Sequence, residues 1–261
     1  MIKSGAIIGL LWLSVSFQIS GDAWLIPDKF FYVPGDTARL NIQQGENFTG
    51  SNTLIENKYI TKLEVLTGER RQDIISLYDA QAKTNIQLPV QSEGLYQVGV
   101  HTTQRISKSA AAINQWLTDY GLDEVLYTRQ NTNTVPAEIL QSTYNRLLFQ
   151  VGDKMEAIPK PDDFPINIIP NNNPYTWKKG DPIQFTILDN GKPAFGVRVK
   201  IWNRNKGLTT IQNIYTEKDG SIKARISNSG SWVVSVAKIA PSTESGLQWE
   251  TYVTNLIFGV K

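Results

Sequence analysis

Alternation of apolar and polar residues over short stretches is the dominant pattern along this chain. The pattern occurs at 38–42, 59–65 and 96–100, and it sharpens at 183–187, 197–201, 222–226 and 232–236. Successive side chains of a β-strand point to opposite faces of its sheet, so each stretch predicts a strand with one buried face.

Turn residues separate these stretches. Asn190-Gly191, Asp219-Gly220 and Ser229-Gly230 each lie between two alternating segments. Gly and Asn tolerate the positive φ angles that tight hairpin turns require. Short strands joined by such turns predict an all-β sandwich fold.

Helical periodicity is confined to an insert near residues 109–150. A first helix is predicted between the capping residue Ser109 and Gly121, with apolar residues at helical spacing: Ile113, Trp116, Leu117 and Tyr120. Pro136 suits a first helical turn and predicts a second helix that runs toward Val151. The end of that segment, Leu147–Val151, fits a strand equally well, because periodicity cannot classify so short a run.

A proline-rich segment at 153–174 marks a predicted domain boundary. Proline removes a ladder donor and fixes φ, so a central strand cannot run through this segment. A Gly-Asp turn precedes an alternating strand on both sides of it, at Gly35-Asp36 and Gly180-Asp181. We therefore expect two related sandwich domains, at 24–158 and 159–261.

Residues 1–23 have the features of an export signal. Lys3 provides a positive start, the apolar run 6–17 follows, and small residues suit cleavage after Ser20, Gly21 or Ala23. The run is shorter than the roughly 20 apolar residues that a spanning helix needs. It therefore predicts a cleaved signal peptide, no membrane span after cleavage, and a periplasmic or secreted protein.

The composition narrows the classes of partner and of chemistry. The chain has no cysteine, and export without disulfides suits a bacterial envelope protein. Its formal charge of +2 is spread along the chain without a basic block, so we expect no nucleic-acid partner.

Few residues offer catalytic or metal-binding chemistry. His101 is the only histidine, and alternation places it opposite the apolar face of its strand, which predicts a surface or edge position. One histidine without cysteine excludes a structural zinc site, and no Gly-x-Ser-x-Gly segment frames a nucleophile. The pair Asp162-Asp163 lies in the proline-rich segment and is interpreted as a solvated linker. The sequence thus predicts a protein that is not an enzyme.

Three tryptophans are candidates for a ligand-facing or partner-facing surface. Trp24 directly follows the predicted signal, and Trp177 precedes a Lys178-Lys179 turn. Trp202 follows Ile201 and so points away from the apolar face of its own strand. Core packing is the competing interpretation for such large side chains.

Several short motifs follow one another along the chain. They are Trp24-Leu25-Ile26-Pro27, Pro34-Gly35-Asp36, Gly94-Leu95-Tyr96, Tyr144-Asn145-Arg146, Asn173-Pro174-Tyr175, Gly191-Lys192-Pro193, Gly230-Ser231-Trp232 and Trp249-Glu250-Thr251-Tyr252. Their order resembles an exported bacterial family of unknown function that is often associated with nickel or cobalt uptake. The resemblance implies Ig-like or transthyretin-like sandwich domains. It also implies a non-catalytic periplasmic binding or accessory protein, with a membrane transporter component or another envelope protein as partner.

One departure from the family affects the implied metal role. Many members carry a histidine before the Trp-Leu segment, where this chain has Gly21, Asp22 and Ala23. Asp22 and His101 then remain as candidate ligands, and nickel or cobalt is implied by the resemblance only. The alternative function is a cell-envelope interaction module that binds a protein or a glycan through sandwich edges and loops.

Overall fold

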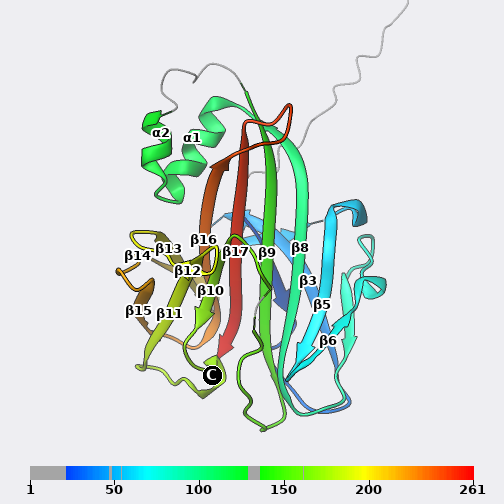
Figure 1. Ribbon diagram of the computed structural model, residues 1–261. Helices are drawn as coiled ribbons and strands as arrows, with labels where there is room; N and C mark the ends of the chain where they lie inside the picture. The colour runs from blue at the N-terminus through cyan, green and yellow to red at the C-terminus, as the bar shows by residue number, and fades with distance from the viewer. Residues whose placement is uncertain (1–21, 47–48, 54, 129–135, 161) are drawn as a thin grey trace, which may run out of the picture.

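A computed structural model of the protein describes residues 22–46, 49–53, 55–128, 136–160 and 162–261 (Figure 1). Residues 1–21, which hold most of the predicted signal peptide, lie outside these ranges. Strands make up most of the described chain, so the prediction of an all-β sandwich fold with a small helical insert is confirmed.

A nine-stranded sheet, called the central sheet below, organises the molecule. Its strands follow the order β14-β13-β16-β17-β9-β8-β5-β6, and β2 pairs with the end of β9. Their bounds are β2 Phe31–Tyr32, β5 Ile60–Thr67, β6 Arg70–Asp73, β8 Gly94–Lys108, β9 Ala137–Val151, β13 Arg198–Asn205, β14 Leu208–Tyr215, β16 Gly230–Pro241 and β17 Trp249–Val260. Neighbouring strands along this order are antiparallel except β17 and β9, which run parallel.

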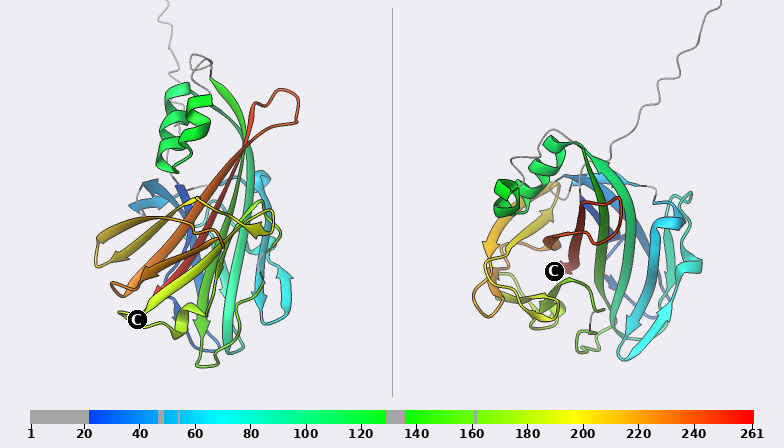
Figure 2. Two further views of the ribbon diagram at one scale, coloured as in Figure 1. Left: turned by 60° about the vertical axis from the view of Figure 1, so that its left-hand side comes forward. Right: turned by 45° about the horizontal axis from the view of Figure 1, so that its top comes forward.

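A four-stranded sheet packs on each face of the central sheet (Figures 1 and 2). The N-terminal cover sheet contains β1 Asp22–Pro27, β3 Thr37–Glu46, β4 Thr49–Asn52 and β7 Ile86–Pro89. The C-terminal cover sheet contains β10 Ile166–Pro170, β11 Pro182–Asp189, β12 Lys192–Pro193 and β15 Ser221–Arg225. Short 3-10 turns lie at Asn57–Tyr59, Ile75–Leu77 and Pro174–Thr176.

Two hydrophobic cores result, one under each cover sheet. Val233 and Ile257 of the central sheet belong to the core under the N-terminal cover sheet, whereas their neighbours Val234 and Phe258 belong to the other core. A strand buried on both faces needs apolar residues at consecutive positions. The sequence supplies them in the runs Leu147–Phe149, Trp232–Val234 and Leu256–Phe258.

The helical insert is smaller than the sequence predicted. The first predicted helix is present as α1, Ala110–Asp119, whose capping residue Ser109 accepts a hydrogen bond from the Ala112 amide. A short helix α2, Asp123–Thr128, follows. Neither of these, nor any other helix in the described ranges, has the length and apolar character that a membrane crossing requires.

The second predicted helix, which was expected to run from Pro136 to Val151, is wrong. Residues 137–151 form the long strand β9, which pairs with β8 along its whole length and with β17 on its other side. Apolar side chains on both sides of this segment mimic a helical stripe, but they reflect burial of a central strand on both faces.

The boundary predicted near residue 158 falls in the connector, residues 152–165, that joins β9 to β10. Strands from both sides of this boundary share the central sheet, because β17 pairs with β9. The connector crosses from the central sheet to the C-terminal cover sheet, and it carries the polar site described next.

Candidate functional site

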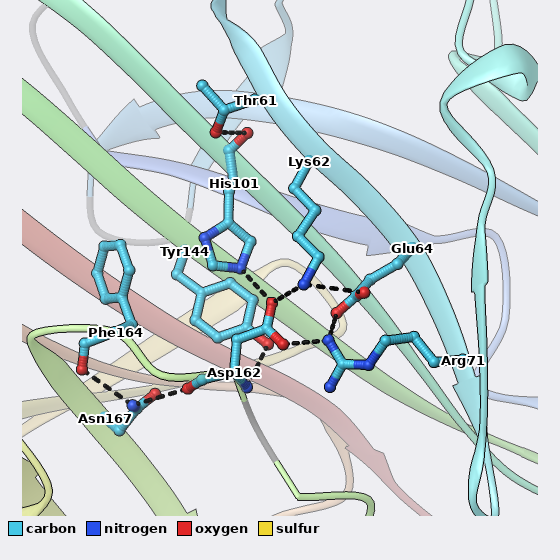
Figure 3. A network of polar contacts seen from close by, with 9 residues as sticks. All are labelled: Thr61, Lys62, Glu64, Arg71, His101, Tyr144, Asp162, Phe164 and Asn167. Carbon is cyan, nitrogen blue, oxygen red and sulfur yellow. Dashed lines mark hydrogen bonds and ion pairs between the residues drawn. The ribbon is translucent and has the colours of Figure 1, made fainter.

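Five charged or titratable side chains from distant parts of the sequence meet at one place on the central sheet (Figure 3). They are called the ion-pair network below: Lys62, Glu64, Arg71, His101 and Asp162. Strand pairing brings the first four together, since Lys62 of β5 lies opposite His101 of β8, and β6 lies beside β5. The connector supplies Asp162.

Two carboxylates share two cations in this network. Lys62 Nζ lies 2.5 Å from an Asp162 oxygen and 3.1 Å from a Glu64 oxygen. The Arg71 guanidinium lies 2.6 Å from Glu64 and also pairs with Asp162. The two carboxylates are nearly covered, with 2% of the Glu64 side chain and 11% of the Asp162 side chain exposed, whereas both cations reach solvent.

His101 lies at the inner side of the network. Its Nε2 atom is 3.0 Å from Asp162 Oδ2. Its ring stacks on Tyr144 with a centroid distance of 3.9 Å and meets the edge of Phe164 at 5.6 Å. Gly99 beside it leaves space for this arrangement, because a Cβ there would lie 3.2 Å from the Tyr144 ring.

Hydrogen bonds between side chains and the connector's backbone hold the connector at the same place. Asn167 Nδ2 donates to the carbonyl oxygens of Asp162 and Phe164, at 3.1 and 3.0 Å. The Asp162 amide lies 3.4 Å from the Tyr144 hydroxyl oxygen. The side chain of Asp162 is thus held against the central sheet, and its backbone contacts both β9 and β10.

The environment shifts the pKa of each acidic or basic group at the centre. Burial lowers the pKa of His101 to about 4, although the charge of Asp162 opposes this shift. Burial would raise the pKa of Asp162, but hydrogen bonds from Lys62 and Arg71 outweigh it and lower the pKa to about 2. Burial raises the pKa of Glu64 above its usual value, against the hydrogen bond from Lys62.

A fully buried cation, Arg146, extends the polar region toward the C-terminal cover sheet. Arg146 of β9 has no exposed surface. It donates to the Ile168 carbonyl at 2.6 Å and to the Gln97 side-chain oxygen at 2.8 Å. These bonds tie β8, β9 and β10 together beside the ion-pair network.

The geometry of the network is that of a clamp. Asp162 accepts hydrogen bonds from two cations, Lys62 and Arg71, and also lies beside His101. The network fixes the connector to β5, β6 and β8.

The tryptophans predicted to face a ligand or partner lie in or against the cores. Trp24 and Trp202 are each 3% exposed and belong to the core under the N-terminal cover sheet. Trp202 does point away from Val199 and Ile201, but that face of β13 is covered too. Trp177 packs edge-on against Phe185 and Phe258 at 5.7 and 5.5 Å, and is partly buried.

The two candidate metal ligands lie in different sheets. Asp22 begins β1 in the N-terminal cover sheet, and the structure does not describe its side chain. His101 lies in the central sheet with Nε2 directed at Asp162. Within the described ranges, no group of three His, Cys, Asp or Glu side chains is arranged to hold a metal ion.

Sequence reasoning identified two members of the network but not their association. His101 was expected at a surface or edge, and Asp162 in a solvated linker, yet both side chains are largely covered. Lys62, Glu64 and Arg71 were missed. Opposite charges two residues apart on the polar face of one strand, at Lys62 and Glu64, are the signal that could have found the site.

Comparison with known proteins places the chain in a family without a known activity. The family model described as "Domain of unknown function (DUF4198)" matches residues 22–239. No curated protein matches the sequence. Among solved structures, the three N-terminal domains of the highly immunogenic outer capsid protein (Hoc) of bacteriophage RB49 give a TM-score of 0.22 at 10% identity, over 92% of this chain and 71% of that one.

Replacing Asp162 by alanine should destabilise the protein by about 2 kcal/mol, because Lys62, Arg71 and His101 lose a shared partner. Urea denaturation measures this loss. The matched control is Asp163→Ala, since Asp163 is exposed beside it. Equal losses for the two variants would contradict the clamp.

His101 should titrate with a midpoint of about pH 4 in the folded protein. It is the only histidine, so its imidazole signals in an NMR titration need no further assignment. Its folded pKa lies below the value of 6.5 expected when exposed, so its contribution to stability is complete above pH 6.5 and is lost as the pH falls toward 4. A midpoint near 6.5 would contradict its placement.

Proposed function

The chain belongs to the DUF4198 family, whose function is unknown, and from this premise we propose that it is an exported, non-catalytic interaction module of the cell envelope that binds a protein partner through the edge strand β14. The observation that carries the proposal is an open sheet edge without charge. β14 ends the central sheet, and no strand in the described ranges pairs with its outer side (Figures 1 and 2).

The composition of β14 favours pairing with another strand. Its sequence, Leu-Thr-Thr-Ile-Gln-Asn-Ile-Tyr, has eight residues and no charge, proline or glycine. β-branched and aromatic residues, which are frequent in strands, make up five of the eight. The unpaired backbone groups of such an edge form a template for strand addition.

Apolar side chains along β14 are exposed. The exposed fractions are 76% for Leu208, 44% for Ile211 and 54% for Tyr215. Phe195, which is 66% exposed, lies near the same strand end, because the Gly196 amide donates to the Thr216 carbonyl. Aromatic side chains are enriched in protein interfaces, so this end of β14 offers an anchor.

The opposite edge of the same sheet provides a contrast. β6 has the sequence Arg-Arg-Gln-Asp, and all four residues are exposed. Proteins discourage unwanted pairing by placing charges on edge strands. One edge of the central sheet therefore carries this protection, and the other lacks it.

The predicted N-terminal signal supports export, and the pairing of β1 favours two of the three predicted cleavage sites. Asp22 and Ala23 pair with Gly45 and Gln44, and the Ala23 carbonyl accepts a hydrogen bond from Asn255 at 2.8 Å. Cleavage after Ser20 or Gly21 keeps these contacts, whereas cleavage after Ala23 removes them.

The mature protein should accordingly begin at Gly21 or Asp22. Intact-mass measurement and N-terminal sequencing of the exported protein test this directly. A mature protein that begins at Trp24 would contradict the expected role of Ala23 in β1.

The link to nickel or cobalt uptake stays a prediction from family resemblance, and the same mass measurement with either metal added would detect an adduct.

Partner binding should map to β14 in cells that export the protein. A photo-crosslinking amino acid at position 211 should yield a covalent adduct with a defined protein, because this side chain lies on the open edge. The control places the same amino acid at position 72, on the charged edge β6. Absence of an adduct at position 211, or identical adducts at both positions, would contradict the proposed function.

A further inference from the structure

We infer that the partner of β14 is a second copy of this chain, an inference that rests on the proposed function of this edge. In the pairing that follows, β14 of two molecules run antiparallel about a twofold axis through Ile211. Three features support a second copy as the partner. They are the uncharged composition of β14, the registers in which β14 can pair with itself, and the edges that stay open after pairing.

The absence of charge along β14 suits pairing with a second copy. In a symmetric antiparallel pair, each half of a strand meets the other half of its own copy. A charged residue near the middle would therefore approach the same charge, and like charges directly opposite each other destabilise a sheet. Residues 208–215 carry no charge, so β14 can pair with itself without such a conflict.

The backbone of β14 limits the registers in which two copies can pair. Residues opposite each other in an antiparallel ladder are either both hydrogen-bonded to one another or both not. Only every second residue of β14 directs its backbone N–H and C=O groups outward. Residues that lie opposite each other in the two copies must therefore be separated by an even number of positions in the sequence. A symmetric pair therefore places one residue opposite itself, and the registers nearest the middle centre on Ile211 or Gln212.

Flanking residues favour the register centred on Ile211. In that register Leu208 meets Ile214 of the second copy, and Lys206, in the turn before β14, comes near the strand end that leads to Glu217. In the register centred on Gln212, the same turn instead comes nearer to Lys218. The first register brings opposite charges near each other at the strand ends, and the second brings like charges together.

The Ile211 register also buries exposed apolar surface. Side chains of directly opposed residues have Cβ atoms about 5 Å apart. The two Ile211 side chains, each 44% exposed in the single chain, would cover each other on the axis. Leu208, which is 76% exposed, gains an apolar neighbour on the other face.

The identity of the partner also determines which sheet edges remain open. A strand added by another protein presents an outer edge that must be protected in turn. A second copy joins two central sheets into one continuous sheet, and its two outer edges are then both β6. Each of those edges carries three charged residues out of four, so every open edge of the joined sheet is protected.

Oligomeric state and position-specific crosslinking test the inference. Light scattering during size-exclusion chromatography should give twice the monomer mass for the exported protein. Ile211→Lys should weaken dimerisation by roughly tenfold or more, because it opposes two ammonium groups on the axis. Gln72→Lys, which adds the same charge to β6, should leave the dimer unchanged.

The absence of cysteine in this chain allows a direct test of register. Ile211→Cys should form a disulfide-linked dimer on mild oxidation, because the residue faces its own copy. Asn213→Cys, exposed on the same face of β14, should not, because it lies opposite Thr209 of the second copy. Linkage at 213 in place of 211 would overturn the inferred register.

The outcomes separate this inference from the proposed function. A monomer that still crosslinks from position 211 to a different protein would overturn the second copy as partner and leave the interaction role standing. A monomer without any adduct at position 211 would overturn both. A dimer that survives Ile211→Lys and gives no linkage at 211 would place the interface elsewhere and overturn the inference.

Discussion

Burial of the central sheet on both faces is the constraint on which the rest of this structure depends. Strands β9, β16 and β17 must present apolar side chains to two cores at once. Burial of a large apolar side chain contributes about 1.5–3 kcal/mol, whereas a typical hydrogen bond contributes about 1 kcal/mol net. Apolar packing therefore determines which strands can occupy the middle. Polar residues there need internal partners, as Asn255 finds in Asn145 at 2.9 Å.

The ion-pair network lies where the core under the C-terminal cover sheet ends. From the central sheet, that core takes residues of β8, β9, β13, β16 and β17, but none of β5. On the same face, β5 presents Lys62 and Glu64, and the connector lies against them. A connector broken by prolines cannot join a ladder, so side-chain interactions must hold it. Removing one partner of such a covered cluster costs more than the cluster as a whole contributes, because the remaining charges are left without compensation.

The sequence was informative where burial is one-sided and local. Alternation predicted β11 and β15 of the C-terminal cover sheet, and the cap at Ser109 with the terminating Gly121 predicted α1. Because β9 is buried on both faces, its apolar and polar residues do not alternate, and the sequence predicted a helix there instead. Trp24 and Trp202 illustrate the same limit, because alternation tells which face a residue takes but not whether another sheet covers that face. The network required contacts between residues up to 100 positions apart, such as Lys62 and Asp162, which no local pattern encodes.

The two edges of the central sheet differ in how they limit unwanted pairing with other strands. An uncharged edge strand is a hazard in a protein that acts alone, since it invites pairing with any exposed strand. Lys206 and Glu217 stand just outside the uncharged segment of β14 and limit how far a partner strand can extend. Charge at the ends with none in the middle restricts pairing to a defined length and a preferred register. The composition of β14 thus favours a specific partner over indiscriminate association, while β6 excludes pairing at the other edge by charge alone.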